Sequence, residues 1–263
     1  KYLEAHAELR EEGCFDQRLK IRLKAVVAVH VMGNVVEMSS LQKLCKKYQL
    51  LLIEDAAEAL GRQYRGQAAG TIGDIGVLSF NGNKIVTTGG GGMVLTQNEE
   101  WARRIRHLST QAKTDGLLYD HDEVGYNFRM NSLSAALGLG QMEILGEILE
   151  RKKKIAERYQ EALGELMNFQ KVGAHVHPNH WLVTGILSQS NRTILPHLNE
   201  SGIQVRPLWK HSHQLPMYQA ALRLDELSTS PMLHQRSISL PSSAGLSEGD
   251  QAHEISSLKE YIR

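Results

Sequence analysis

The chain has 263 residues, with 30 lysines and arginines against 29 aspartates and glutamates, which gives a formal net charge of +1. This length provides for one large domain or two modest ones around a substantial core. The balanced charge excludes the strongly basic surfaces that attract nucleic acids and anionic membranes, so we expect neither as a partner.

Cysteine usage and hydropathy indicate the compartment. Cys14 and Cys45 have no CxxC spacing and no disulfide framework, which is typical of reduced thiols in the cytosol. No apolar run approaches the roughly 20 residues of a membrane helix. The charged start KYLEAHAELREEG is unlike a secretory signal. We therefore expect a cytoplasmic protein.

The first part of the chain predicts a helix followed by a parallel crossover. Residues 2–12 have the pattern of an amphipathic helix. The apolar runs 24–31 and 50–54 predict two buried strands, and residues 41–48 predict a helix between them, capped by a preceding serine. Ligands gather at the carboxyl ends of strands in such a crossover, and Asp55 stands at one of these ends.

Shorter elements follow, and they suggest two domains. The patterns predict, in chain order, a weak helix at 56–60, strands at 76–80 and 93–96, a helix at 99–108 capped by Asn98, a long functional loop at 109–131, a long helix at 145–163, and helices at 192–201 and 248–263 among short strands. We interpret residues 1–145 as a large domain. Residues 146–263 are then a bridging helix and a small α+β domain.

Lys84 is the strongest chemical signal in the sequence. It ends the string SFNGNK (79–84), lies just before the glycines 89–92 and follows the acidic pair Glu54-Asp55 at a strand end. Such a lysine can hold pyridoxal phosphate: its amine forms a Schiff base, an acid protonates the pyridine nitrogen, and a hydroxyl contacts the phosphate. Lysine suits this role because burial or a nearby cation lowers its pKa, and the neutral amine then attacks a carbonyl.

Two other patterns carry less chemistry. The glycines 89–92 are similar to a nucleotide-binding loop, but such a loop opens a helix, whereas residues 93–96 continue as a strand. We interpret these glycines as tight backbone beside the cofactor. The histidines at 175, 177 and 180 lack cysteine or carboxylate partners, so we expect no metal site.

Several strings in the same order carry a family resemblance. They are VHVMGN, IEDAAEALG, GDIGVLSFNGNK, TTGGGGMV and VGYNFRMNSLSAALGLGQ, from about Val29 to Gly138. This region resembles the DegT/DnrJ/EryC1/StrS sugar aminotransferases, most closely the enzymes that aminate 4-keto sugars on the routes to bacillosamine and legionaminic acid. The resemblance implies an α/β protein of fold type I, with a mostly parallel sheet in a large domain that binds pyridoxal phosphate and a smaller α+β domain.

The resemblance also implies a reaction. An amino acid, glutamate, would donate its amine through pyridoxal phosphate to a nucleotide-linked 4-keto-6-deoxy sugar, in the synthesis of amino sugars for a surface polysaccharide or glycan. Lys84 would hold the cofactor and shuttle a proton. Asp55 would pair with the pyridine nitrogen, and Glu58, where many relatives have glutamine, would reach the phenolic oxygen from the same face of a helix. Ser79 would bind the phosphate, and the small Ala57 would leave room for the ring.

Three further residues complete the expected site. Asn127 is either a turn residue or, as the resemblance implies, a ligand of the cofactor phosphate in the neighbouring subunit, which would make a homodimer with shared active sites the working unit. Arg206, in the string RPLW, is a candidate for contact with an anionic group of the substrate. His30 is either a core histidine or a residue near the cofactor.

Two other functions remain open. Some relatives are sugar dehydratases that replace the Schiff-base lysine by histidine, and Lys84 argues against this reading. Residues 1–24 match neither the phosphate-binding turn nor the ring-stacking residue that relatives carry upstream. The sequence therefore predicts an N-terminally incomplete member with an uncovered apolar sheet face, and a truncated remnant without catalysis is the other alternative.

Overall fold

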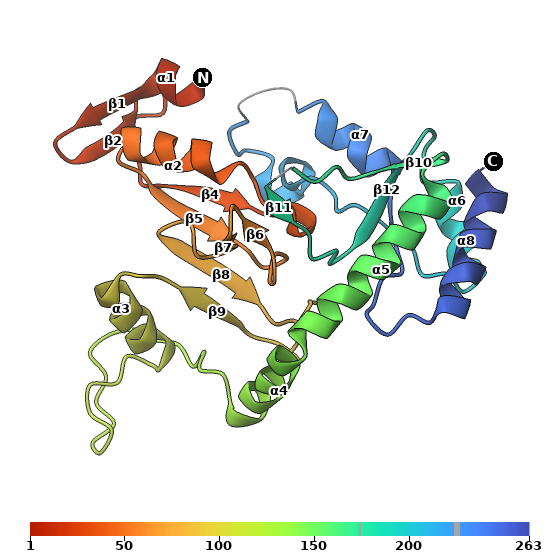
Figure 1. The fold of residues 1–263 in the computed structure, drawn as a ribbon. Helices are drawn as coiled ribbons and strands as arrows, with labels where there is room; N and C mark the ends of the chain where they lie inside the picture. The colour runs from red at the N-terminus through yellow and green to blue at the C-terminus, as the bar shows by residue number, and fades with distance from the viewer. Residues whose placement is uncertain (174, 224–226, 263) are drawn as a thin grey trace. The chain divides into compact units, whose positions relative to one another are not determined.

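The computed structural model describes residues 1–173, 175–223 and 227–262. It divides into two compact units (Figure 1). The first comprises Lys1–Glu147 and Gly173–Asn179, and the second comprises Ile148–Val172 and the residues from His180 onward. The large and small domains expected from the sequence stay a prediction.

The first unit is organised around a four-stranded sheet with the order β4-β5-β8-β9 (Figure 1). Its strands are β4 (Ala25–Val29), β5 (Leu51–Asp55), β8 (Ile75–Ser79) and β9 (Gly92–Leu95). β4, β5 and β8 run parallel, and β9 is antiparallel to β8. Helix α2 (Met38–Lys47) makes the crossover from β4 to β5. The predicted parallel crossover is confirmed.

The two faces of this sheet differ in exposure. Side chains alternate between the faces, and one set, which includes Ala28, Leu52 and Leu78, is buried. The opposite set includes Val27 and Val29, whose side chains are 59% and 47% exposed. The prediction that 24–31 is a buried strand is therefore wrong for one face, because only the other face is packed. The expectation of an uncovered apolar face is confirmed.

The N-terminal segment differs from its prediction. Helix α1 (Tyr2–His6) is only five residues long, and the chain then forms an antiparallel sheet of β1 (Ala7–Arg10), β2 (Gly13–Asp16) and β3 (Ile21–Leu23). A turn at Gly13, whose φ of +123° suits glycine, brings β2 back against β1. Cys14 and Asp16 are buried, and Asp16 accepts a hydrogen bond from the Tyr2 hydroxyl at 2.5 Å. These pairings replace the helical bonds expected over residues 2–12.

The weak helix expected at 56–60 is also absent, and the chain turns there instead. The Asp55 carboxylate accepts a hydrogen bond from the amide of Ala57 at 3.1 Å, which favours a turn over a helix. The Asn179 side-chain amide donates to the carbonyls of Glu58 and Leu60, at 2.8 and 3.0 Å. The Ala57 amide and the carbonyls of Glu58 and Leu60 are therefore engaged by side chains and not by the backbone bonds of a helix.

The serine cap of α2 is likewise a wrong prediction. Glu37 occupies the N-cap position of this helix. Ser39 lies inside the helix, and its hydroxyl is 2.8 Å from the Tyr64 hydroxyl. Its side chain is therefore engaged in a tertiary contact.

The first unit contains several further elements besides the sheet. They are the 3₁₀ turn η1 (Val31–Gly33), β6 (Gln63–Tyr64), β7 (Gln67–Ala68), α3 (Glu99–Ser109), α4 (Ser132–Glu143), the start of α5 (Leu145–Leu163) and β11 (Val176–His177), which pairs with β6. The predicted cap of α3 is confirmed, because the Asn98 side chain accepts from the amide of Trp101 at 3.0 Å. The predicted long helix at 145–163 is confirmed as α5.

The second unit packs helices against an antiparallel sheet with the order β10-β12-β14-β13. Its elements, besides most of α5, are β10 (Met167–Phe169), β12 (Val183–Leu187), α6 (Ile194–Glu200), β13 (Arg206–Pro207), η2 (Ser212–Gln214), η3 (Pro216–Tyr218), α7 (Thr229–Arg236), β14 (Ser237–Leu240) and α8 (Glu248–Ile262). Tyr159, Leu198, Ile238 and Leu258 are fully buried in its core. The sequence did not predict α7, whose Pro231 is tolerated because the amides of a first turn have no helical acceptor.

No helix in the described ranges combines the length and the apolarity needed to cross a membrane.

Candidate active site

The carboxyl end of the parallel sheet carries two of the expected residues. Asp55 ends β5 and Ser79 ends β8. Asp55 pairs in register with Val77, so Asp55, Val77 and Ser79 lie on the same, exposed face of the sheet. A carboxylate and a hydroxyl thus share the edge at which α/β sheets bind ligands.

Lys84 and Glu58 form an ion pair near this edge. Their Nζ and Oε1 atoms are 3.7 Å apart, and the side chains are 13% and 20% exposed. The other oxygen of Glu58 accepts from the amide of Met32 at 2.7 Å. Met32 has a left-handed backbone, with φ of 57°, which residues other than glycine seldom adopt. Glu58 is therefore held by a loop far away in the sequence and not by the helix that was expected.

Burial raises the pKa of Glu58 above its ordinary value, and the negative charge of Asp55 adds to this. The Met32 amide and the Lys84 ammonium act in the opposite direction. Glu58 can therefore hold or release a proton close to the Lys84 amine.

The glycine-rich loop connects Lys84 to β9. Gly89 and Gly91 have φ angles of +79° and +88°, which explains why glycine occupies these positions. The amides of Phe80 and Thr88 bond to the carbonyls of Gly91 and Phe80, both at 3.0 Å. The loop therefore folds back tightly beside the segment that carries Lys84.

Glu54 is the main residue that sequence reasoning missed. It is fully buried and accepts hydrogen bonds from the amides of Gly70, Ile72 and Gly73 at 2.9, 2.6 and 2.7 Å. The Nε2 atom of His30 lies 2.9 Å from Oε2 of Glu54, the oxygen that also accepts from the amide of Gly70. A signal was present, since Glu54 has the parity of the buried residues of β5. The sequence alone does not separate its role from that of Asp55, because the two carboxylates are adjacent at the end of one strand.

His30 belongs to this buried network. Its side chain is 0% exposed, and its Nδ1 accepts from the amide of Val36 at 3.4 Å. An accepting Nδ1 leaves the proton on Nε2, where it faces Glu54. His30 is therefore placed as a core histidine.

Asn127 lies at the base of a projecting arm, residues 110–127. Residues 110–131 form the long loop expected from the sequence, and two isolated backbone bridges cross it, Thr110 to Asn127 and Lys113 to His121. Asn127 is exposed, and its two neighbours in the sequence, Tyr126 and Phe128, stack on each other with ring centroids 5.0 Å apart.

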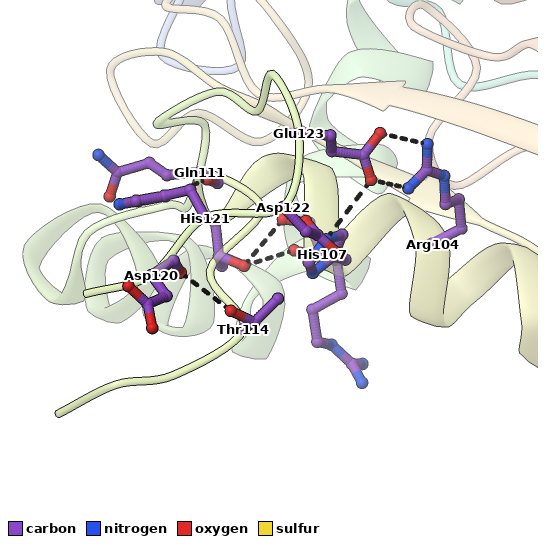
Figure 2. Close-up of polar contacts among 10 residues, drawn as sticks. Arg104, His107, Gln111, Thr114, Asp120, His121, Asp122 and Glu123 are labelled. Atoms are coloured by element: carbon purple, nitrogen blue, oxygen red, sulfur yellow. Dashed lines mark hydrogen bonds and ion pairs between the residues drawn. The ribbon is translucent and has the colours of Figure 1, made fainter. Parts of the chain in front are cut away.

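Ion pairs fasten this arm to α3 (Figure 2). Arg104 donates to both carboxylate oxygens of Glu123, one of them at 2.6 Å, and this pairing lowers the pKa of Glu123. His107 lies 2.7 Å from Asp122 and 3.5 Å from Glu123.

Three of these side chains could in principle hold a metal ion. Among the described residues, the potential ligand atoms of His107, Asp122 and Glu123 all lie within 4.8 Å of one another. We assign them to fastening the arm, because Arg104 already occupies both oxygens of Glu123 and a cation would have to displace it. The three histidines at 175, 177 and 180 are not part of this group.

Arg206 lies in the second unit, on β13. Its Nη1 donates to the side chain of Asn199 at 2.7 Å and to the carbonyl of Val205 at 2.8 Å, and its side chain is exposed. The guanidinium is therefore held in place with part of its donors directed to solvent.

The chemistry of this donor set fits pyridoxal phosphate. The group needs an amine, an acid for its ring nitrogen and donors for its phosphate. Lys84 carries an amine, Glu58 and Asp55 carry carboxyl groups and Ser79 carries a hydroxyl, and they lie at neighbouring strand ends and in the segments that follow them. The open face around Asp55 is apolar and suits the flat side of a ring.

Comparison with known proteins gives consistent matches. Residues 15–259 match the model of the DegT/DnrJ/EryC1/StrS aminotransferase family. EpsN of Bacillus subtilis, whose name assigns it to the pyridoxal phosphate-dependent aminotransferases, is 39% identical over 88% of this chain and 62% of its own length. GDP-perosamine synthase of Vibrio cholerae is 36% identical over 99% of this chain and 73% of its own length. The chain thus spans less than two thirds of the first of these relatives.

A solved structure gives the same result for the fold. Helicobacter pylori PseC, an aminotransferase of pseudaminic acid biosynthesis, superposes with a TM-score of 0.84 at 27% identity, over 92% of this chain and 67% of PseC. The predicted α/β architecture, fold type I, is confirmed.

Proposed function

The chain belongs to the DegT/DnrJ/EryC1/StrS aminotransferase family, and on that premise we propose that it moves an amino group from glutamate to a nucleotide-linked 4-keto-6-deoxy sugar. The observation that carries the proposal is the pairing of Lys84 with Glu58 at 3.7 Å. Both side chains are mostly buried, and Asp55 is close enough for its charge to act on Glu58. The names of the relatives, which include GDP-perosamine synthase, support a nucleotide sugar as the acceptor.

Four residues would hold the cofactor, and each has a separate task. Lys84 would bond covalently to it, Asp55 would keep its ring nitrogen protonated, Ser79 would bind its phosphate, and the small Ala57 would leave room for the ring. When bound, pyridoxal phosphate supplies an electron sink for the carbanion that forms as the donor loses its proton.

Lys84 and Glu58 would then take part in proton transfer. A neutral amine at Lys84 can take a proton from the α-carbon of the amino-acid donor and later return it to another atom of the reacting groups. Glu58 would orient that amine, from which it lies 3.7 Å away, and burial raises the pKa of the Glu58 carboxyl above its ordinary value. Lys84 also favours amino transfer over dehydration, for which relatives carry histidine.

The reaction assay separates the candidate functions. The 263-residue chain, supplied with pyridoxal phosphate, glutamate and a nucleoside-diphosphate 4-keto-6-deoxy sugar, is expected to release ketoglutarate in step with amino sugar. Mass spectrometry of the sugar and enzymatic detection of ketoglutarate measure both products. Loss of a hydroxyl without ketoglutarate would establish a dehydratase instead. No turnover, together with a cofactor spectrum identical to that of the free compound, would establish a non-catalytic remnant.

The working unit that we propose is a homodimer in the cytoplasm with shared active sites. Asn127 is exposed between Tyr126 and Phe128, which are 52% and 74% exposed, and aromatic residues of this kind are enriched in interface cores. Helix α4 also exposes Leu133 and Leu139, at 83% and 66%. Asn127 would reach the cofactor phosphate of the neighbouring subunit.

Mixing two inactive variants tests this shared site. In a heterodimer of Asn127→Ala and Lys84→Ala subunits, one pocket receives both defects and the other receives intact Lys84 and Asn127 from opposite chains. Verified heterodimers are therefore expected to recover about half of the wild-type activity. A mixture of Asp55→Ala and Lys84→Ala subunits is the matched control and should not recover, because both residues serve the pocket of their own chain. Absence of recovery in the first heterodimer would refute the shared site.

A further inference from the structure

The second unit carries a pair of stacked tryptophans. The rings of Trp181 and Trp209 are nearly parallel, with an angle of 6° and a centroid distance of 6.0 Å. Trp181 is 2% exposed, whereas Trp209 is 57% exposed. The buried indole of Trp181 therefore packs against the indole of Trp209, and the indole of Trp209 exposes much of its surface to solvent.

The strands of the unit hold this pair in place. Trp181 comes just before β12, and Trp209 comes just after β13, and these two strands flank β14 on opposite sides. β13 pairs with the buried strand β14 through Arg206 and Pro207. The carbonyl of Leu208 accepts a hydrogen bond from Nδ1 of His234 at 2.7 Å. The backbone on the N-terminal side of Trp209 is therefore fixed, and an exposed ring on a fixed backbone loses little entropy when it binds a ligand.

Two exposed cationic residues lie within three positions of Trp209 in the sequence, Arg206 and Lys210. The nearest acidic residues in the sequence are Glu200 on one side and Asp225 and Glu226 on the other. Arg206 is held by the side chain of Asn199 and the carbonyl of Val205, with part of its guanidinium exposed. A flat aromatic surface in a cationic segment suits a ligand that has both a planar ring and negative charge.

We propose that Trp209, supported by Trp181, stacks on the base of a nucleoside diphosphate, and that Arg206 and Lys210 attract its diphosphate. This inference rests on the proposed function, in which the acceptor sugar is linked to a nucleotide. Every base offers a π-face to an aromatic side chain, so stacking tolerates different bases. Guanidinium and ammonium groups are the usual partners of phosphate oxygens.

Equilibrium binding of UDP, GDP and inorganic pyrophosphate to the 263-residue chain tests the proposal. Trp209→Ala is expected to weaken the binding of both nucleotides by about tenfold or more, because it removes the stacking surface. Trp209→Phe keeps a flat ring and should remain within about threefold of the wild type. Pyrophosphate has no base, so its affinity should not depend on Trp209. Trp101→Phe, a substitution in α3, is the matched control and should change none of these affinities.

Several outcomes would overturn the proposal. They are equal nucleotide affinity in Trp209→Ala, a parallel loss of pyrophosphate binding, and absence of nucleotide binding in the wild type. If Trp209→Ala does not fold, fluorescence decides: nucleotide is expected to quench the emission of the stacked pair Trp181 and Trp209, the tryptophans that remain in the Trp101→Phe protein, and no quenching refutes stacking.

The cofactor spectrum separates this proposal from the proposed function. A covalent adduct of pyridoxal phosphate at Lys84, with nucleotide affinity that does not depend on Trp209, would support the proposed function and refute stacking on Trp209. Nucleotide binding that depends on Trp209, without any adduct at Lys84, would support stacking and refute the proposed function.

Discussion

Replacing Lys84 with alanine is expected to abolish the absorbance band of covalently bound pyridoxal phosphate and to lower amino transfer by roughly 10²–10⁴-fold, the usual contribution of a positioned acid–base group. Lys84 is 13% exposed and lies 3.7 Å from Glu58, so its amine is both accessible and oriented. Absorbance titration of the 263-residue chain measures the band. Borohydride reduction followed by peptide mass spectrometry identifies the modified lysine.

Lys152 provides a demanding control for this experiment. Burial lowers its pKa to about 8, so its amine is partly neutral near physiological pH and chemically able to attack an aldehyde. Its Nζ is nevertheless bonded to the carbonyl of Ser242, and the residue is 6% exposed. Lys152→Met should leave the band unchanged. A band that persists in Lys84→Ala, or a reduced adduct found on Lys152, would remove Lys84 from its assigned role.

Replacing Glu54 with glutamine is expected to lower the free energy of unfolding by about 3–5 kcal/mol, as is typical when one partner of a buried, charged network is lost. The carboxylate accepts bonds from three backbone amides and faces Nε2 of His30. A glutamine amide would direct N–H groups at donors, which leaves buried donors unpaired. Urea denaturation followed by circular dichroism measures the loss. Glu150→Gln, on the exposed face of α5, is the control and should change stability by no more than about 0.5 kcal/mol.

The same network predicts a dependence of stability on pH. Burial alone would raise the pKa of Glu54, but the bonds from His30, Gly73, Gly70 and Ile72 outweigh burial and hold the pKa below its ordinary value. The stabilisation is therefore fully present above the pKa of a glutamate in the unfolded chain, about 4.3. It is lost as the pH falls from there through the lower pKa of the folded state. The difference in stability between wild type and Glu54→Gln should shrink over this acidic range, and a constant difference would contradict the role assigned to the carboxylate.

Local patterns were enough to predict several parts of this protein. The apolar runs and their spacing predicted the parallel crossover that places Asp55 at a strand end, and Asn98 predicted the start of α3. The strings around Lys84 predicted the family and its fold. These features depend on residues close together in the sequence, where periodicity, capping and loop chemistry act directly.

Only the tertiary structure decided the rest, because the competing interactions join residues far apart in the chain. Glu58 is oriented by the amide of Met32 and by Lys84, and the helix expected around it is replaced by bonds from Asn179. Pairing of β1 with β2 ended the first helix at His6. Helical propensity contributes only a few tenths of a kcal/mol per residue, so a few tertiary hydrogen bonds or a buried side chain outweigh it over so short a segment.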